Sequence, residues 1–122
     1  MKLKFFLLSI LFLSFTNCFS QEFTVLATHY KGQGLDTDYP FKGTFIIKDS
    51  SLILDCDQFH LDAQTTKDKS GLITYQYENR EYKLQIIDKK GNYNKISYDF
   101  ILITKTDDIV GGEVSTYYCK IK

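Results

Sequence analysis

Apolar and polar residues alternate along much of the chain, and this alternation predicts its structure. The longest clean run places four apolar side chains on one face, Ile96, Tyr98, Phe100 and Leu102. Ser97 and Asp99 fall on the opposite face. Such a period of two is typical of a half-buried β-strand. We therefore predict that the apolar set is buried and that Ser97 and Asp99 face outwards, because a one-residue slip would bury a carboxylate.

The alternation recurs in shorter runs, and turn residues separate them. Asn79 tolerates the positive φ of a tight turn, and Asp88–Gly91 has the composition of a type I turn with a left-handed glycine. Two stretches, 31–42 and 63–71, show no regular pattern and are predicted to be irregular. About eight strands are predicted, at 22–30, 43–48, 51–56, 58–62, 72–78, 81–88, 93–104 and 114–121.

Composition favours strands over helices. After residue 20 the chain contains 38 Val, Ile, Thr, Tyr or Phe residues but only two alanines, and apolar residues do not recur with a helical period. Short connections make neighbouring strands antiparallel. The predicted fold class is therefore all-β, a single small antiparallel barrel or sandwich. We favour the barrel because the second half reads as a meander and because closure removes exposed sheet edges.

The N-terminus has the features of a secretion signal. Two lysines precede an apolar run that ends at Phe15, and small residues stand at the −3 and −1 positions of a cut before Gln21. This apolar run is short for a membrane span. We therefore predict that residues 1–20 are a signal peptide and that the protein is secreted or periplasmic. Two alternatives stay open: retention as an N-terminal anchor, and a lipoprotein anchored through Cys18.

The remaining residues, 21–122, have the length of a single domain. The 122-residue chain has 15 basic and 15 acidic side chains. Two of the lysines lie in the predicted signal, so the formal net charge of the mature chain is −2. This charge argues against nucleic acid as a partner. We expect no transmembrane span in the mature chain, because no second apolar stretch is long enough.

Two cysteines, Cys56 and Cys119, remain after removal of the signal. In an oxidising compartment an even number of cysteines favours a disulfide, and a bridge over so long a loop would contribute roughly 4 kcal/mol. We therefore predict a Cys56–Cys119 disulfide. The alternative is two unrelated buried thiols, since cysteine also serves as a small core residue.

Catalytic motifs are scarce. The chain has neither a G-x-S-x-G nor an S-x-x-K motif, and its only histidines are His29 and His60. Cys56 and His60 lie four residues apart, which is some 13 Å in one strand at about 3.3 Å per residue. We therefore expect no enzymatic activity, with a small hydrolase as an alternative.

Metal-binding patterns are weak as well. Aspartates cluster in two predicted loop regions, Asp36 with Asp38 and Asp55 with Asp57 and Asp62. Calcium binds such carboxylates, but the EF-hand spacing is absent and aspartate is a common turn residue. Zinc ligation by His29, His60 and Cys56 lacks the dense spacing of zinc motifs. We expect neither a metal nor a cofactor.

Tyrosine placement suggests a binding site. If the last four predicted strands form a meander, Tyr77, Tyr82 and Tyr117 gather at the same end of the sheet. Phenols at the mouth of a barrel bind ligands by stacking and hydrogen bonding. The alternative is an ordinary rim position, where a tyrosine buries its ring and keeps its hydroxyl in water.

Together these features predict an exported, non-catalytic binding domain. The first hypothesis is a barrel that binds a small, partly apolar ligand at the tyrosine end. The alternative is a protein–protein interaction module, such as an inhibitor or an envelope-associated adaptor, that uses a loop or an edge strand. A lined cavity would favour the first hypothesis and an exposed apolar patch the second.

Overall fold

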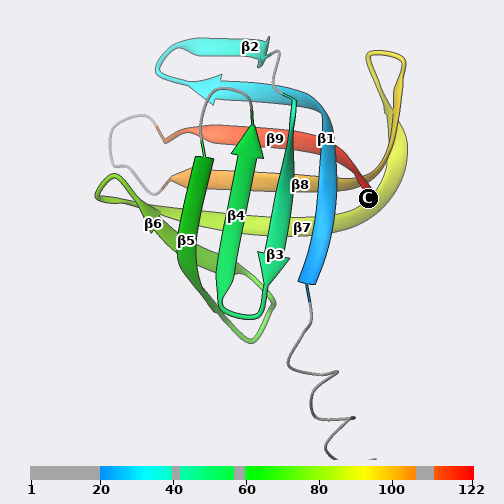
Figure 1. Ribbon diagram of the computed structural model, residues 1–122. Coiled ribbons are helices and arrows are strands. Elements are labelled where there is room, and N and C mark those ends of the chain that lie inside the picture. Colours follow the sequence, from blue (N-terminus) through cyan, green and yellow to red (C-terminus); the bar gives the residue numbers. More distant parts are fainter. Residues whose placement is uncertain (1–19, 40–41, 57–59, 107–111) are drawn as a thin grey trace, which may run out of the picture.

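The computed structural model describes residues 20–39, 42–56, 60–106 and 112–122 (Figure 1). These residues form nine strands: β1 (Ser20–Gly32), β2 (Leu35–Tyr39), β3 (Gly43–Lys48), β4 (Ser51–Cys56), β5 (His60–Lys67), β6 (Ile73–Tyr77), β7 (Arg80–Tyr93), β8 (Ile96–Thr106) and β9 (Val114–Ile121). The predicted all-β class is confirmed. Eight strands form a closed antiparallel barrel in the order β1-β3-β4-β5-β6-β7-β8-β9, with β9 pairing back onto β1, and β2 is an extra strand.

Strand β1 takes part in two regions of the molecule. Its first half, Ser20–Val25, pairs with β3, and its second half, from Thr28 to Gly32, pairs with β2. The register against β9 shifts between Val25 and Ala27, which marks a bulge. Because a bulge bends a strand, β1 runs beside β3 and then turns to lie between β2 and β9 (Figure 1). Strand β2 therefore extends the sheet beyond the barrel.

Side chains from the inner faces of the barrel strands fill the core. The largest fully buried ones are Phe23, Phe45, Leu52, Leu84, Leu102 and Cys119. Burial of such an apolar side chain contributes about 1.5–3 kcal/mol. The predicted strands 43–48, 51–56 and 114–121 have the observed bounds.

In three of the hairpins between described strands, the turn has two residues and both have positive φ. These turn residues are Gln33 with Gly34, Glu78 with Asn79, and Asn94 with Lys95. Positive φ at both positions is the type I′ turn, whose twist matches that of the adjoining strands. The predicted turn at Asn79 is therefore confirmed.

The predicted turn at Asp88–Gly91 is wrong, because β7 continues through it to Tyr93. The register against β8 shifts between Asp88 and Gly91, so these residues form a bulge, and the chain reverses at Asn94 and Lys95 instead. Gly91 is not needed for a left-handed turn. A Cβ atom there would lie 2.5 Å from Oη of Tyr98, so glycine allows the Tyr98 ring to approach the backbone.

Both stretches predicted to be irregular contain strand. Residues 31–42 include the last residues of β1 and all of β2, and residues 63–71 include the second half of β5. All five residues of β2 are exposed, and β5 is mostly exposed after Leu61. Because these segments bury little, few of their residues are apolar, and any alternation within them is weak. The start of the predicted strand at 58–62 lies outside the described residues.

The predicted register of β8 is correct for most of its length. Leu102 is fully buried, Tyr98 is buried, and Phe100 packs edge-on against Phe23 with ring centroids 5.3 Å apart. Ser97 is exposed and Asp99 is half-buried. The prediction for Ile96 is wrong: it is 36% exposed, because it directly follows the turn at the tip of the β7–β8 hairpin, beyond the barrel.

The predicted disulfide between Cys56 and Cys119 is not formed. Cys119 lies on β9 and Cys56 ends β4, and both β1 and β3 lie between these strands in the sheet. Three strand spacings of about 4.8 Å make roughly 14 Å along the wall, whereas a disulfide needs Cα atoms within about 7 Å. Cys119 instead serves as a core residue, and burial raises the pKa of its thiol to about 12.

Candidate functional site

The predicted tyrosines lie on the inner face of the barrel at one end. Tyr82 stacks on Tyr75, with ring centroids 5.2 Å apart, and Tyr117 packs edge-on against Phe45 at 4.8 Å. Tyr77 is partly buried against the same core. The structure therefore brings Tyr77, Tyr82 and Tyr117 to one hydrophobic cluster, and it adds Tyr75, which is 7% exposed.

These phenols are hydrogen-bonding groups and not bases. Burial raises the pKa of Tyr75, Tyr82 and Tyr117, because desolvation disfavours the phenolate. A protonated phenol both donates and accepts a hydrogen bond. The tyrosine end can therefore orient a polar group of a ligand, but it does not supply a nucleophile.

Glu113 joins the hairpins at the rim of this end. Its Oε1 accepts a hydrogen bond from Nε2 of Gln33 at 3.0 Å and lies 3.5 Å from a guanidinium nitrogen of Arg80. Burial, and then a hydrogen bond of its hydroxyl to Glu113, raise the pKa of Tyr30. The carboxylate thus holds the β1–β2 turn and the start of β7 to the same point.

Strand β2 continues the inner face past the barrel. Tyr117, Thr28 and Tyr39 are opposite one another across β9, β1 and β2, so their side chains share a face. Leu35 and Tyr39 on this face are 57% and 54% exposed, and the Tyr39 ring lies 6.5 Å from that of Tyr30. We call Leu35, Thr37 and Tyr39, the inner-face side chains of β2, the β2 ledge. It forms an exposed, partly apolar surface continuous with the tyrosine end.

Thr28 lies between the β2 ledge and the tyrosines. It is 5% exposed, and its Oγ1 is buried without a hydrogen-bond partner in the described part of the molecule. Buried hydroxyl groups are nearly always hydrogen-bonded, because an unpaired one loses its hydration without compensation. A polar atom at this place, from water or from a ligand, would satisfy the Thr28 hydroxyl.

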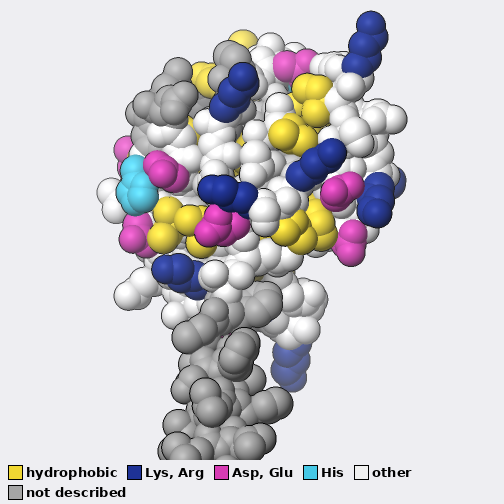
Figure 2. Space-filling model, turned by 45° about the vertical axis from the view of Figure 1, so that its right-hand side comes forward, with side chains coloured by type: hydrophobic (Ala, Val, Ile, Leu, Met, Phe, Trp, Pro, Cys, Tyr) yellow, Lys and Arg dark blue, Asp and Glu magenta, His cyan; other side chains and the backbone are white. Residues whose placement is uncertain are grey.

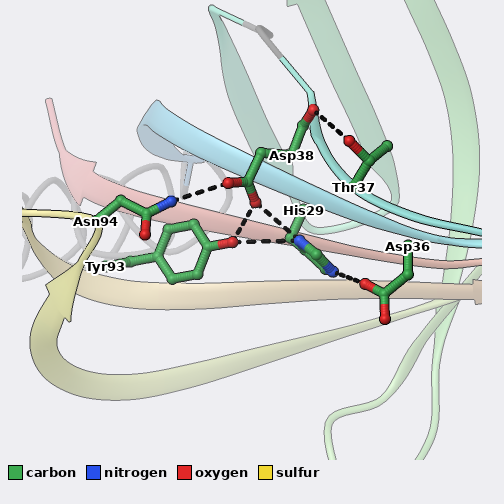
Figure 3. Close-up of polar contacts among 6 residues, drawn as sticks. All are labelled: His29, Asp36, Thr37, Asp38, Tyr93 and Asn94. Carbon is green, nitrogen blue, oxygen red and sulfur yellow. Dashed lines mark hydrogen bonds and ion pairs between the residues drawn. The ribbon is translucent and has the colours of Figure 1, made fainter.

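A second cluster lies on the outer face, around His29 (Figure 3). His29 Nδ1 is 2.8 Å from Oδ1 of Asp38, and its Nε2 is 2.5 Å from Oδ1 of Asp36. The Tyr93 hydroxyl donates to Asp38, and Nδ2 of Asn94 donates to the other oxygen of Asp38 at 2.9 Å. We call these five residues the His29 cluster; it ties β2 to β1 and to the tip of the β7–β8 hairpin.

The charges in the His29 cluster support one another. Hydrogen bonds to Asp38, and then to Asp36, raise the pKa of His29, because a ring with both nitrogens protonated donates to both carboxylates. Hydrogen bonds from Tyr93 and then His29 lower the pKa of Asp38, while the carboxylate raises the pKa of Tyr93 to about 12. With both ring nitrogens in contact with carboxylates of β2, His29 links β1 to β2.

Aromatic rings complete the contact between the β7–β8 hairpin and the barrel. Tyr93 stacks on Tyr118 with ring centroids 4.1 Å apart and planes 10° apart, and Tyr98 lies 4.9 Å from the same ring. Such aromatic pairs contribute roughly 0.5–1.5 kcal/mol beyond their buried area. The hairpin tip is therefore packed as well as hydrogen-bonded against β9, β1 and β2.

The other candidate chemistry is not assembled. His60 lies opposite Asp55 in the β4–β5 pair, 3.4 Å from its carboxylate, while His29 is on β1. Across 20–39, 42–56, 60–106 and 112–122, no three His, Cys, Asp or Glu side chains form a group suited to a metal ion, and no helix could cross a membrane. Asp57 lies outside these ranges. Figure 2 shows a face on which positive, negative and hydrophobic side chains are interspersed.

Sequence reasoning missed the β2 ledge, Glu113 and the His29 cluster. A signal for β2 existed: Leu35, Thr37 and Tyr39 alternate with two aspartates, directly after Gln33-Gly34. Calcium ligation by these aspartates was considered, and they were interpreted as turn residues of an irregular stretch instead. No local pattern places Glu113 or Tyr93, because each acts on residues far away in the sequence.

Comparison with protein-family models, curated protein sequences and solved structures gave no match for this chain. The fold defines it as a closed eight-stranded antiparallel β-barrel with an added hairpin strand. Its function is therefore argued from the two sites above.

Proposed function

We propose that this protein is an exported, non-catalytic binding domain that takes a small, partly apolar ligand at the tyrosine end of its barrel. The observation that carries the proposal is the β2 ledge together with the buried Thr28 hydroxyl beside it. An exposed apolar patch alone would suit a protein partner as well, whereas a buried hydroxyl without a partner among the described residues favours the polar atom of a small ligand. Leu35 and Tyr39 are both more than half exposed on the inner face, and no other large apolar side chain among the described residues is as exposed. A ligand lying on this ledge would remove their surface from water, at about 25 cal/mol per Å².

Two polar features support the same site. The Thr28 hydroxyl, buried beside Tyr39 and Tyr117, has no hydrogen-bond partner among the residues that the structure describes. The nearby phenols stay protonated and can donate hydrogen bonds. The ligand is therefore expected to combine an apolar part for the ledge with a polar atom that reaches Thr28.

A series of alkyl 4-hydroxybenzoates, from methyl to hexyl, provides probes of this chemistry. Titration into the mature protein, followed by two-dimensional NMR, should shift the amide signals of Tyr30, Tyr39 and Tyr117. The dissociation constant should fall about three- to fourfold per methylene that is buried on the ledge. Tyr39→Ala and Leu35→Ala should each weaken hexyl-ester binding at least tenfold.

Two controls separate ligand binding from general stickiness. Ile121→Ala removes a similarly exposed apolar side chain, 50% exposed, near the other end of β9, and should leave the affinity unchanged. Thr28→Val keeps the side-chain shape without the hydroxyl, and should weaken binding while leaving stability unchanged or higher. Equal affinities for all variants, or shifts confined to other surfaces, would contradict the proposed site.

A further inference from the structure

Strand β2 has an unpaired edge. In the described sheet β2 pairs only with β1, whereas every barrel strand has a neighbour on each side. All five of its residues are exposed. An edge of this kind presents backbone groups to which another strand can pair.

The turn determines which backbone groups are presented. In a two-residue hairpin the residues flanking the turn, here Gly32 and Leu35, exchange hydrogen bonds, and the pattern then alternates along the strands. Thr37 and Tyr39 therefore also bond to β1. The N–H and C=O groups of Asp36 and Asp38 point the other way, towards solvent.

Side-chain hydrogen bonds hold this edge in place. The His29 cluster fixes Asp36 and Asp38, so β2 does not need to be ordered on binding. Preorganisation lowers the entropic cost of adding a strand. Lysine, proline and a bulge, which often protect an edge, are absent from Leu35–Tyr39, and the charges that it carries are those of Asp36 and Asp38.

Charge indicates what kind of strand fits. The Asp36 side chain is 62% exposed and that of Asp38 is 52% exposed, both on the outer face of β2. In a symmetric antiparallel pair of two β2 strands, Asp36 of one copy would lie opposite Asp38 of the other, and like charges in that position are destabilising. A strand with Lys or Arg on that face, and with apolar residues beside the β2 ledge, is favoured instead.

We propose that the outer edge of β2 binds an extended, basic-apolar segment of a partner protein as an added β-strand. Backbone hydrogen bonds to Asp36 and Asp38 supply the pairing, a cationic side chain contacts the Asp36 carboxylate, and alternate apolar side chains cover Leu35 and Tyr39. The backbone pairing does not depend on a small ligand at the tyrosines, although both occupants would cover Leu35 and Tyr39.

Amide hydrogen exchange tests the proposal with a defined probe, the peptide acetyl-Thr-Val-Lys-Val-Lys-Val-Thr-amide. In the mature protein alone, the Asp36 and Asp38 amides should exchange quickly. With 2 mM peptide they should slow at least fivefold, while the amides of Thr37 and Tyr39 should change little. Asp36→Asn should weaken binding severalfold and reduce its dependence on salt, because it removes only the charge.

Asp36→Pro removes the outward N–H but leaves the β1 pairing groups intact, so it should abolish binding. Because proline can disturb β2 itself, a peptide methylated on every backbone nitrogen provides a second measure on the unaltered protein, and it should not bind. Equal binding by the methylated peptide, or no protection of Asp36 and Asp38 at 2 mM, would overturn the proposal. Protection that rises with protein concentration alone would assign the edge to a second copy and overturn it as well.

Discussion

Gly91 illustrates how one residue holds the outer hairpin in place. A Cβ atom at this position would lie 2.5 Å from Oη and 2.8 Å from Cζ of Tyr98. The Tyr98 ring cannot easily retreat, because it is buried and packs against Tyr118. The absence of a side chain at residue 91 is therefore what allows this aromatic packing.

We expect Gly91→Ala to lower the free energy of unfolding by about 1–3 kcal/mol, the range for overpacking at a close contact. Urea denaturation measures the change. In a Tyr98→Ala background the clash is absent, so the same substitution should cost much less, and a double-mutant cycle reports the difference. If the two backgrounds give the same loss, the contact is not the reason for the glycine.

At the scale of elements, β2 and the β7–β8 hairpin are joined by ionisable groups, so their docking depends on pH. The pKa of His29 is raised in the folded protein above 6.5, and its stabilisation is therefore complete below pH 6.5 and lost as pH rises through the raised value. The pKa of Asp38 is lowered below 3.8, so its contribution is present above pH 3.8 and lost as pH falls through the lowered value. The cluster should stabilise the fold most between these limits.

We predict that His29→Gln lowers the melting temperature at about pH 5.5 and that the difference from the unaltered protein shrinks at about pH 9. The reason is that the lost interaction involves the charged ring, which is deprotonated in both folded and unfolded chains at high pH. His60→Gln, at a side chain that is 59% exposed, is the matched control and should change the melting temperature little. A His29→Gln effect that is constant from pH 5.5 to 9 would show that the ring acts only by packing.

The elements differ in how well the sequence predicts them. Where one face enters the core, as in Gly43–Lys48 and Val114–Ile121, alternation gives the observed bounds. All five residues of β2 are exposed, so its composition resembles that of a loop. The sequence predicts a turn at Asp88–Gly91, whereas the chain turns at Asn94-Lys95. Glycine is needed at residue 91 for a contact with Tyr98, which no local pattern reveals.

The candidate site was predictable to a similar degree. Tyr82 and Tyr117 follow from alternation and meander order, and they do share the inner face at one end. Cys56 and Cys119 show the limit of such reasoning. Their separation in sequence satisfies loop-closure arguments, but barrel closure places two strands between them. Distances across a closed sheet depend on strand order and not on sequence spacing.

For the whole molecule, the chain ends and the β2 ledge lie at different ends of the barrel. β1 begins at Ser20 and reaches the tyrosine end at Gly32, and near its start the backbone N–H of Lys122 donates to the carbonyl of Glu22 at 3.1 Å. The described chain ends therefore lie together, far from the β2 ledge (Figure 1). Under the lipoprotein alternative, an anchor at Cys18 would attach two residues before β1 and leave the ledge free to bind.

Removal of the predicted signal should leave the barrel intact. A cut before Gln21 removes Ser20, which pairs with Lys48 of β3. The other β1–β3 pairs, from Gln21 to Val25, remain. Barrel closure by β9 begins at Phe23 and is untouched. The mature chain should therefore fold with a stability equal to that of a longer chain retaining residues 18–20, within about 0.5 kcal/mol, since one terminal strand pair contributes little.

Mass spectrometry of the exported protein should give a chain that starts at Gln21, in part cyclised to pyroglutamate. A mass that fits a lipid-modified start at Cys18 would contradict this and place the protein on a membrane surface.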